Sequence, residues 1–318
     1  MTGLKFSRRL ALALLASAAA MPLRAQAAPF QVVATTGMIA DAAQRIGEGV
    51  VEVQGLMGPG VDPHAYRQTR SDIVAMARAD LVLWHGLFLE AQMEGFFEDL
   101  ARSGQVVAVA ESLPKNLLRA HDNYADKYDP HVWMAPALWA QVVANMGALF
   151  NGLLPDHVTT LTANLSAYLA EIAAVHAYAT TALATIPAEQ RVLVTAHDAF
   201  NYLGAAYNIE VLGIQGMSTE SEAGLNRVGE LVDLLVARKV NAVFVESSVS
   251  DRNMRALIEG AGAQGHQVAI GGQLFSDAMG ADGSYEGTYI GMIDHNVTTI
   301  TRALGGQAPI GGMQGMLA

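Results

Sequence analysis

The chain of 318 residues contains no cysteine, and this absence excludes several classes of site at once. Structural disulfides, thiolate metal sites and cysteine nucleophiles are ruled out, and we expect no lipid anchor on a mature N-terminus. The HExxH, Walker and GxSxG motifs are absent too, which weakens the case for an enzyme. Any metal site must therefore be built without thiolate donors.

Basic residues are also scarce. Lys and Arg number 19 against 30 Asp and Glu, which gives a formal net charge of −11. Residues 1–27 hold four of the basic residues and no acidic one, so residues 28–318 carry a formal charge of −15. So acidic a surface repels nucleic acid and anionic membranes and mildly favours the approach of a cation. We therefore expect no nucleic-acid partner.

The first 27 residues are predicted to be a cleaved signal peptide. Basic residues between Lys5 and Arg9 precede the apolar run Leu10–Ala20, and Ala25-Gln26-Ala27 fits a small-x-small cleavage site. The apolar run is too short to span a bilayer as a helix. We expect a mature chain that is exported to the periplasm, is monomeric and does not insert into the membrane.

Strand-like and helical runs alternate in both halves of the mature chain, which predicts an α/β fold with mostly parallel sheets. One helical run spans residues 87–101, and the Gly-rich tail from Gly305 is expected to fray. An uninterrupted helical pattern follows Pro155, with a 3.6-residue apolar repeat. We predict two Rossmann-like α/β lobes joined by one long rigid helix: an N-terminal lobe 28–154, an interlobe helix 155–186 and a C-terminal lobe 187–318.

One short phrase occurs twice, as Asp62-Pro63-His64 and as Asp129-Pro130-His131. Each Asp-Pro pair forms a turn, because proline fixes its own backbone angle and restricts the residue before it. Each turn delivers one histidine, the commonest metal ligand. For a single histidine, a core or surface role is the simpler interpretation, but the repetition distinguishes His64 and His131 from the others.

Two further candidates, His197 and Asp277, follow predicted strands of the second half. Ligands of open α/β sheets bind beyond the carboxyl ends of the strands. We therefore predict that His64, His131, His197 and Asp277 hold one transition-metal ion between the two lobes.

Other residues near these positions have alternative interpretations. Asp277 could instead cap a helix N-terminus, and Asp282 and Asp294 are its local rivals. His85 follows a strand end and is expected to line the cleft without binding the ion. His121 stands in a polar loop, 111–128, where it could assist metal capture or simply face solvent.

Two other motifs favour structural roles. Gly260–Gly265 spells GxGxxG, but it follows a helix and precedes a strand, the reverse of a dinucleotide fingerprint. The run Ser218–Glu222 is interpreted as the capped start of a helix, with acids in its first turn.

Three imidazoles and one carboxylate suit Zn²⁺, Mn²⁺ or Fe²⁺. Four protein ligands close a tetrahedral site, so the set favours carriage of the ion over catalysis. The alternative is a periplasmic metallohydrolase in which three histidines and a water bind the metal and Asp277 acts as a base. A metal-bound water, with Asp277 beyond bonding distance, would favour that alternative.

The mature chain resembles the TroA-like family (cluster A-I) of periplasmic solute-binding proteins that serve zinc and manganese ABC importers. Besides the two Asp-Pro-His phrases, the similar segments are Thr195–Phe200, Gln215–Glu222, Phe244–Val249 and Phe275–Gly280. The resemblance implies two α/β lobes joined by one long helix, with His64, His131, His197 and Asp277 as metal ligands. It also implies delivery to a membrane permease.

The resemblance leaves the choice of metal open between zinc and manganese. Manganese-associated members often carry Glu where this chain has His197, which favours zinc. Zinc-specialised members usually carry a long His-rich loop, and loop 111–128 holds only His121, which favours manganese.

Overall fold

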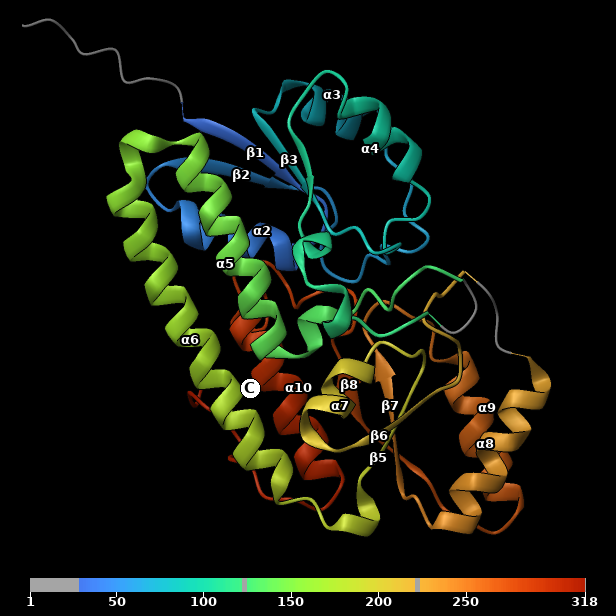
Figure 1. Cartoon of the computed structure of the whole chain (residues 1–318). Coiled ribbons are helices and arrows are strands. Elements are labelled where there is room, and N and C mark those ends of the chain that lie inside the picture. Colours follow the sequence, from blue (N-terminus) through green and yellow to red (C-terminus); the bar gives the residue numbers. More distant parts are fainter. Residues whose placement is uncertain (1–28, 122–124, 221–223, 318) are drawn as a thin grey trace, which may run out of the picture.

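The computed structural model describes residues 29–121, 125–220 and 224–317. The predicted signal peptide, 1–27, lies outside the described residues. The mixed α/β architecture with parallel sheets and a long helix is confirmed, and its two lobes are stacked one above the other in Figure 1.

The N-terminal lobe is built on a four-stranded parallel sheet in the order β2-β1-β3-β4. Its strands are β1 (Phe30–Ala34), β2 (Val51–Gly55), β3 (Leu81–Trp84) and β4 (Val106–Ala108). The helices of this lobe are α2 (Gly37–Gly47), α3 (Arg70–Arg78), α4 (Glu94–Leu100) and α5 (Pro136–Leu153). Hydrophobic residues of β1 and β3, such as Val32 and Leu81, are buried.

The C-terminal lobe contains two parallel strand pairs, β5-β6 and β7-β8, and β5 lies beside β7. The strands are β5 (Val192–Thr195), β6 (Glu210–Gly213), β7 (Ala242–Glu246) and β8 (Ala269–Leu274). The helices are α7 (Asn201–Tyr207), α8 (Leu225–Arg238), α9 (Arg252–Ala263) and α10 (Tyr289–Ala303). In Figure 1, α8 and α9 lie on one side of these strands and α10 on the other.

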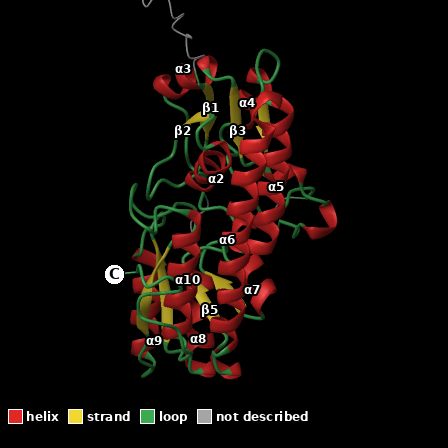
Figure 2. Ribbon diagram, turned by 90° about the vertical axis from the view of Figure 1, so that its left-hand side faces the viewer, coloured by secondary structure: helices red, strands yellow, loops and turns green. Residues whose placement is uncertain are grey.

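Helix α6 (Val158–Ala184) runs along both lobes, as Figures 1 and 2 show. Its 27 residues span about 40 Å at 1.5 Å per residue. It packs against α2 and α5 of the first lobe and α10 of the second. By length and hydropathy, Pro155–Ala184 could cross a membrane, but these three helices cover one face of α6, with Leu161, Ile172 and Val175 buried.

A buried polar junction ties three helices together. The hydroxyl of Tyr168 on α6 donates a hydrogen bond to Asp41 Oδ2 on α2 at 2.7 Å. The backbone N–H of Tyr289, at the start of α10, donates to the same oxygen at 3.4 Å. Burial raises the pKa of Asp41. Because removing one partner would leave buried polar groups unpaired, the junction stiffens the connection between the lobes.

The helix predicted to begin at Leu87 is confined to Glu94–Leu100, so this prediction is wrong in its first half. Leu87 and Phe88 have φ of 53° and 72°, after Gly86 at 80°, and a right-handed helix cannot include such residues. The buried carboxylate of Glu90 accepts the N–H of Gly86 at 3.2 Å and holds this turn in place.

The tail is also more ordered than predicted. The N–H of Met313 donates to both carboxylate oxygens of the buried Asp294, at 2.8 and 2.9 Å. The N–H of Gln307 donates to Thr185 Oγ1 at 2.7 Å. Residues 305–317 therefore pack onto α6 and α10, and the expectation of fraying is wrong.

Candidate metal centre

The four predicted site residues come from four loops at the carboxyl ends of strands. His64 lies in the loop after β2, and His131 lies in the long connection after β4. His197 follows β5 by two residues, and Asp277 follows β8 by three. The structure brings all four together, with one ligand atom from each within 4.8 Å of the others.

The donor atoms face one another at close range. Nε2 of His64 lies 3.3 Å from Nε2 of His131. The carboxylate of Asp277 places Oδ1 at 3.3 Å from His131 Nε2 and Oδ2 at 3.2 Å from His197 Nε2. All four side chains are buried, with exposed fractions of 0–2%.

Two carboxylates outside this group fix the orientation of two imidazoles. Nδ1 of His131 lies 2.7 Å from Asp129 Oδ1, and Nδ1 of His197 lies 2.5 Å from Glu246 Oε2. An ionised carboxylate only accepts, so each Nδ1 carries the hydrogen and donates it. The Nε2 atoms of His131 and His197 therefore face the centre of the group, and in the neutral rings they present lone pairs there, as in metal-ligating histidines.

The geometry fits a tetrahedral metal ion. Two ligand nitrogens bonded to one metal at about 2.0–2.1 Å, with a tetrahedral angle between them, lie about 3.3–3.4 Å apart. Three of the separations, at 3.2–3.3 Å, match this edge length, and the four donor atoms all lie within 4.8 Å of one another. His197 Nε2 and Asp277 Oδ1 are buried without a hydrogen-bond partner, and a central cation would satisfy both.

Burial and charge push the pKa values of these groups in different directions. Burial lowers the pKa of His64 to about 3, although Asp277 opposes the shift. For His131 burial acts in the same sense, but Asp129 and Asp277 outweigh it and raise the pKa. The pKa of His197 is also raised, because Asp277 and Glu246 outweigh burial.

The carboxyl group of Asp277 shows the complementary effect. Burial acts to raise its pKa, but the neighbouring histidines, His197 first, hold it well below the usual range. Asp277 is therefore ionised and supplies the one negative charge inside the group of four. That charge partly offsets a divalent cation, which lowers the cost of burying it.

The competing interpretations of Asp277 and its neighbours are not borne out. No helix begins at Asp277, so it is not an N-cap. Asp282 is exposed, and Asp294 is buried on α10, where it anchors the tail. Neither joins the group of four.

His85 lies beside the site without facing the centre. It is fully buried, its Nε2 lies 2.6 Å from the carbonyl oxygen of Pro130, and its ring meets Trp133 edge to face. It thus supports the turn that carries His131, instead of lining a cleft as predicted. His121 is also buried, with an exposed fraction of 8%. Residues 122–124, which follow it, lie outside the described parts of the chain.

Sequence reasoning missed the role of Glu246. Its side chain accepts the N–H of His197 at 2.9 Å as well as the ring N–H, and it is 3% exposed. The available signal was an acidic residue at the end of the apolar strand β7, on the same sheet edge as His197.

The predicted capped helix at Ser218–Glu222 is wrong for the residues that the structure describes. Helix α8 begins at Leu225 after Gly224, without a side-chain cap. Thr219 instead donates to Asp62 Oδ2 at 2.5 Å, and Glu220 accepts from Gln92. Both bonds reach from the second lobe to the first.

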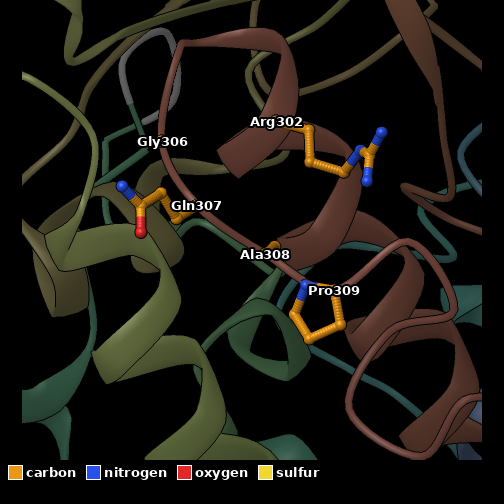
Figure 3. Close-up of a pocket in the computed structure, with 5 residues that line it drawn as sticks. All are labelled: Arg302, Gly306, Gln307, Ala308 and Pro309. Carbon is orange, nitrogen blue, oxygen red and sulfur yellow. The ribbon is translucent and has the colours of Figure 1, made fainter.

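A separate hollow of about 470 Å³ shares no residue with this centre. It is lined by the tail and the end of α10, as Figure 3 shows: Arg302, Gly306, Gln307, Ala308 and Pro309. It is open to solvent and offers no cluster of metal-ligating side chains.

The fold and the buried His₃Asp group together define a solute-binding protein of the kind that serves metal ABC importers. More specifically, residues 32–303 match the model for the periplasmic component A of the zinc-uptake complex, ZnuA, and the chain belongs to that family.

Relatives of this chain carry the names of three metals. Manganese-binding lipoprotein MntA of Bacillus subtilis is 48% identical over 86% of this chain and 89% of its own length. Zinc-binding protein TroA of Treponema pallidum is 45% identical over 86% and 88%, and iron-binding protein YfeA of Yersinia pestis is 33% identical over 87% and 86%. The solved structure of TroA matches with a TM-score of 0.84 over 87% of this chain and 99% of that one.

Proposed function

We propose that this protein captures one divalent transition-metal ion, Zn²⁺ or Mn²⁺, between its lobes and delivers it to the permease of an ABC importer. The ligands are His64, His131, His197 and Asp277. The lobes comprise residues 28–154 and 187–318, and the helix of residues 155–186 joins them.

The observation that carries the proposal is the set of donor separations of 3.2–3.3 Å among four buried side chains. In the neutral rings these nitrogens present lone pairs, and a cation between them and the carboxylate of Asp277 would offset their mutual repulsion. The donor chemistry favours borderline divalent ions and disfavours Mg²⁺ and Ca²⁺, which prefer oxygen ligands alone.

The same geometry favours carriage over hydrolysis. Asp277 directs one oxygen toward His131 and the other toward His197, so it occupies the fourth ligand position itself. A catalytic zinc site keeps that position for water. We therefore propose a non-enzymatic carrier. In the metallohydrolase alternative Asp277 would have to act as the general base, but here it serves as a ligand.

The expected setting is the periplasm. Relatives of this chain are named as lipoproteins of metal ABC transporters or as periplasmic binding proteins, which places the family outside the cytoplasm. A predicted signal peptide and the lack of cysteine favour a free periplasmic form over a lipid-anchored one.

The proposal is tested by metal analysis of protein purified without chelator, followed by competition titration of Zn²⁺ against Mn²⁺. We expect one ion per chain and loss of that ion in His197→Ala, because three donors cannot close the site. His157→Ala removes an exposed histidine and serves as the matched control. Wild-type protein without bound metal, or a His197→Ala variant with unchanged affinity, would refute the proposal.

A further inference from the structure

The buried ligands pose a question of access. With exposed fractions of 0–2%, none of the four can be reached by an ion from solvent unless part of the surrounding wall moves. Two cavities adjoin this wall, and they differ greatly in size.

The smaller cavity is a poor route. Its volume is only about 30 Å³, although the carboxylates of Asp277 and Asp282 both belong to its lining. A space of this size holds about one water molecule. A divalent ion would have to shed its hydration shell before it met a ligand.

The larger cavity, of about 590 Å³, has polar walls drawn from both lobes. It is lined by Asp62 of the first lobe and by residues of the second: Gln215, Thr219, Val228, Ser248, Val249, Ser250, Arg252, Asn253 and Ala256. The space accommodates a hydrated ion, and the polar side chains replace part of its hydration as it moves inward.

Two residues of this cavity also touch the ligand group. Asp62 Oδ1 accepts the N–H of His64 at 2.9 Å, and Ser248 Oγ donates to Asp277 Oδ2 at 3.4 Å. Asp62 and Ser248 therefore form the wall between the cavity and the buried centre.

The second oxygen of Asp62 is bonded across the lobes. Its partner is the hydroxyl of Thr219, at 2.5 Å. The next residue, Glu220, accepts a hydrogen bond from Gln92 of the first lobe. Both interlobe bonds end on the same short segment, so a shift of that segment breaks them together and frees an oxygen of Asp62.

We propose that the ion passes between solvent and its ligands through the larger cavity, and that the Asp62–Thr219 hydrogen bond is the gate. Asp62 is the first anionic oxygen that an incoming ion meets, and Thr219 keeps that oxygen occupied while the gate is closed. The proposal rests on the metal-carrying function and adds the route and the residues that control it.

The first test removes the hydroxyl alone. Thr219→Val keeps the side-chain shape, and Thr219→Ser keeps the hydroxyl as the matched control. With Zn²⁺ as the probe and a coloured chelator in stopped flow, we expect Thr219→Val to raise both association and dissociation rates roughly two- to tenfold, the effect of losing one hydrogen bond. The Kd should change less than either rate, and Thr219→Ser should behave like the wild type.

Two other outcomes of this test would contradict the proposal that the Asp62–Thr219 bond is a gate. Unchanged rates in Thr219→Val would exclude a barrier at this bond. A faster dissociation with unchanged association would show that Thr219 merely positions the loop of His64. Failure of the wild-type protein to bind either Zn²⁺ or Mn²⁺ would instead refute the metal-carrying function, so the two failures are distinguishable.

The second test locks the segment while leaving Asp62 and Thr219 intact. Because the chain has no cysteine, Gln92→Cys/Glu220→Cys can be joined selectively by a short bis-maleimide. We expect this cross-link to slow Zn²⁺ uptake and release by about tenfold or more, as for a closed lid. The same variant capped with N-ethylmaleimide is the control, and equal exchange rates in the two forms would overturn the proposal.

Discussion

The two Asp-Pro-His turns share one hydrogen bond and differ in the other contacts of their aspartates. In each, the aspartate accepts the backbone N–H of the histidine two residues later, at 2.9 Å for Asp62 and 3.0 Å for Asp129. This hydrogen bond defines an Asx-turn. It sets the direction in which His64 and His131 leave the backbone.

The remaining contacts of the two aspartates separate their roles. Asp129 is fully buried and also accepts the ring N–H of His131, so it fixes the imidazole. Asp62 instead accepts a hydrogen bond from Thr219 of the other lobe, at a cavity wall. The same local sequence thus yields one fixed ligand support and one support that meets solvent.

The largest expected effect tests the feature that the two turns share. His64→Ala and His131→Ala should each weaken Zn²⁺ binding by more than about 100-fold, since loss of a supporting partner alone costs 10–100-fold. Isothermal titration measures the affinity, and circular dichroism checks that the fold persists. An unchanged affinity in either variant would show that this histidine is not a ligand and that the two turns are not equivalent.

An intermediate effect should separate the two aspartates. Asp129→Asn is expected to reduce the Zn²⁺ affinity about 10- to 100-fold, because the amide no longer fixes and polarises the imidazole of His131. Asp62→Asn should change the affinity less but slow association, since an incoming ion loses a carboxylate. Equal effects of the two variants on affinity and on rate would show that the turns have one role.

The smallest expected effect concerns protons. Carboxylates raise the pKa values of His131 and His197, so these rings hold protons that an incoming metal must displace, and binding should tighten as the pH rises from about 6 to 8. His64 is neutral there, because burial lowers its pKa to about 3.

Titrations in buffers with different ionisation enthalpies count the released protons. Asp129→Asn should reduce the number, because it lowers the pKa of His131. Asp62→Asn should leave the number unchanged. Identical counts in both variants would contradict the assignment of the protons to the second turn.

Much of the fold could be predicted because its determinants are local. Alternating strands and helices predicted the sheets, and the unbroken apolar repeat after Pro155 predicted α6. The four candidate residues stood out because one phrase is repeated and the others follow strands. A parallel sheet gathers such positions at one edge, so distance along the chain did not hide them.

The remaining features depend on contacts between distant residues, which local patterns do not encode. Glu246 becomes important only because β7 lies beside β5, which carries His197. Thr219 belongs to the run 218–222, whose local pattern predicts a helix start, but its hydroxyl bonds to Asp62, 157 positions away. The helix predicted from residue 87 starts only at Glu94, because Leu87 and Phe88 adopt left-handed angles that such residues rarely adopt.

The junction of Asp41, Tyr168 and Tyr289 has a consequence for recognition by a membrane partner. It links α2, α6 and α10 by hydrogen bonds, beside a hydrophobic cluster that contains residues of both lobes. We expect a molecule braced in this way to keep nearly the same outline when it is loaded and when it is empty. We infer that an importer distinguishes the two forms by the shape of a small patch of loops, and that the overall spacing of the halves carries little information.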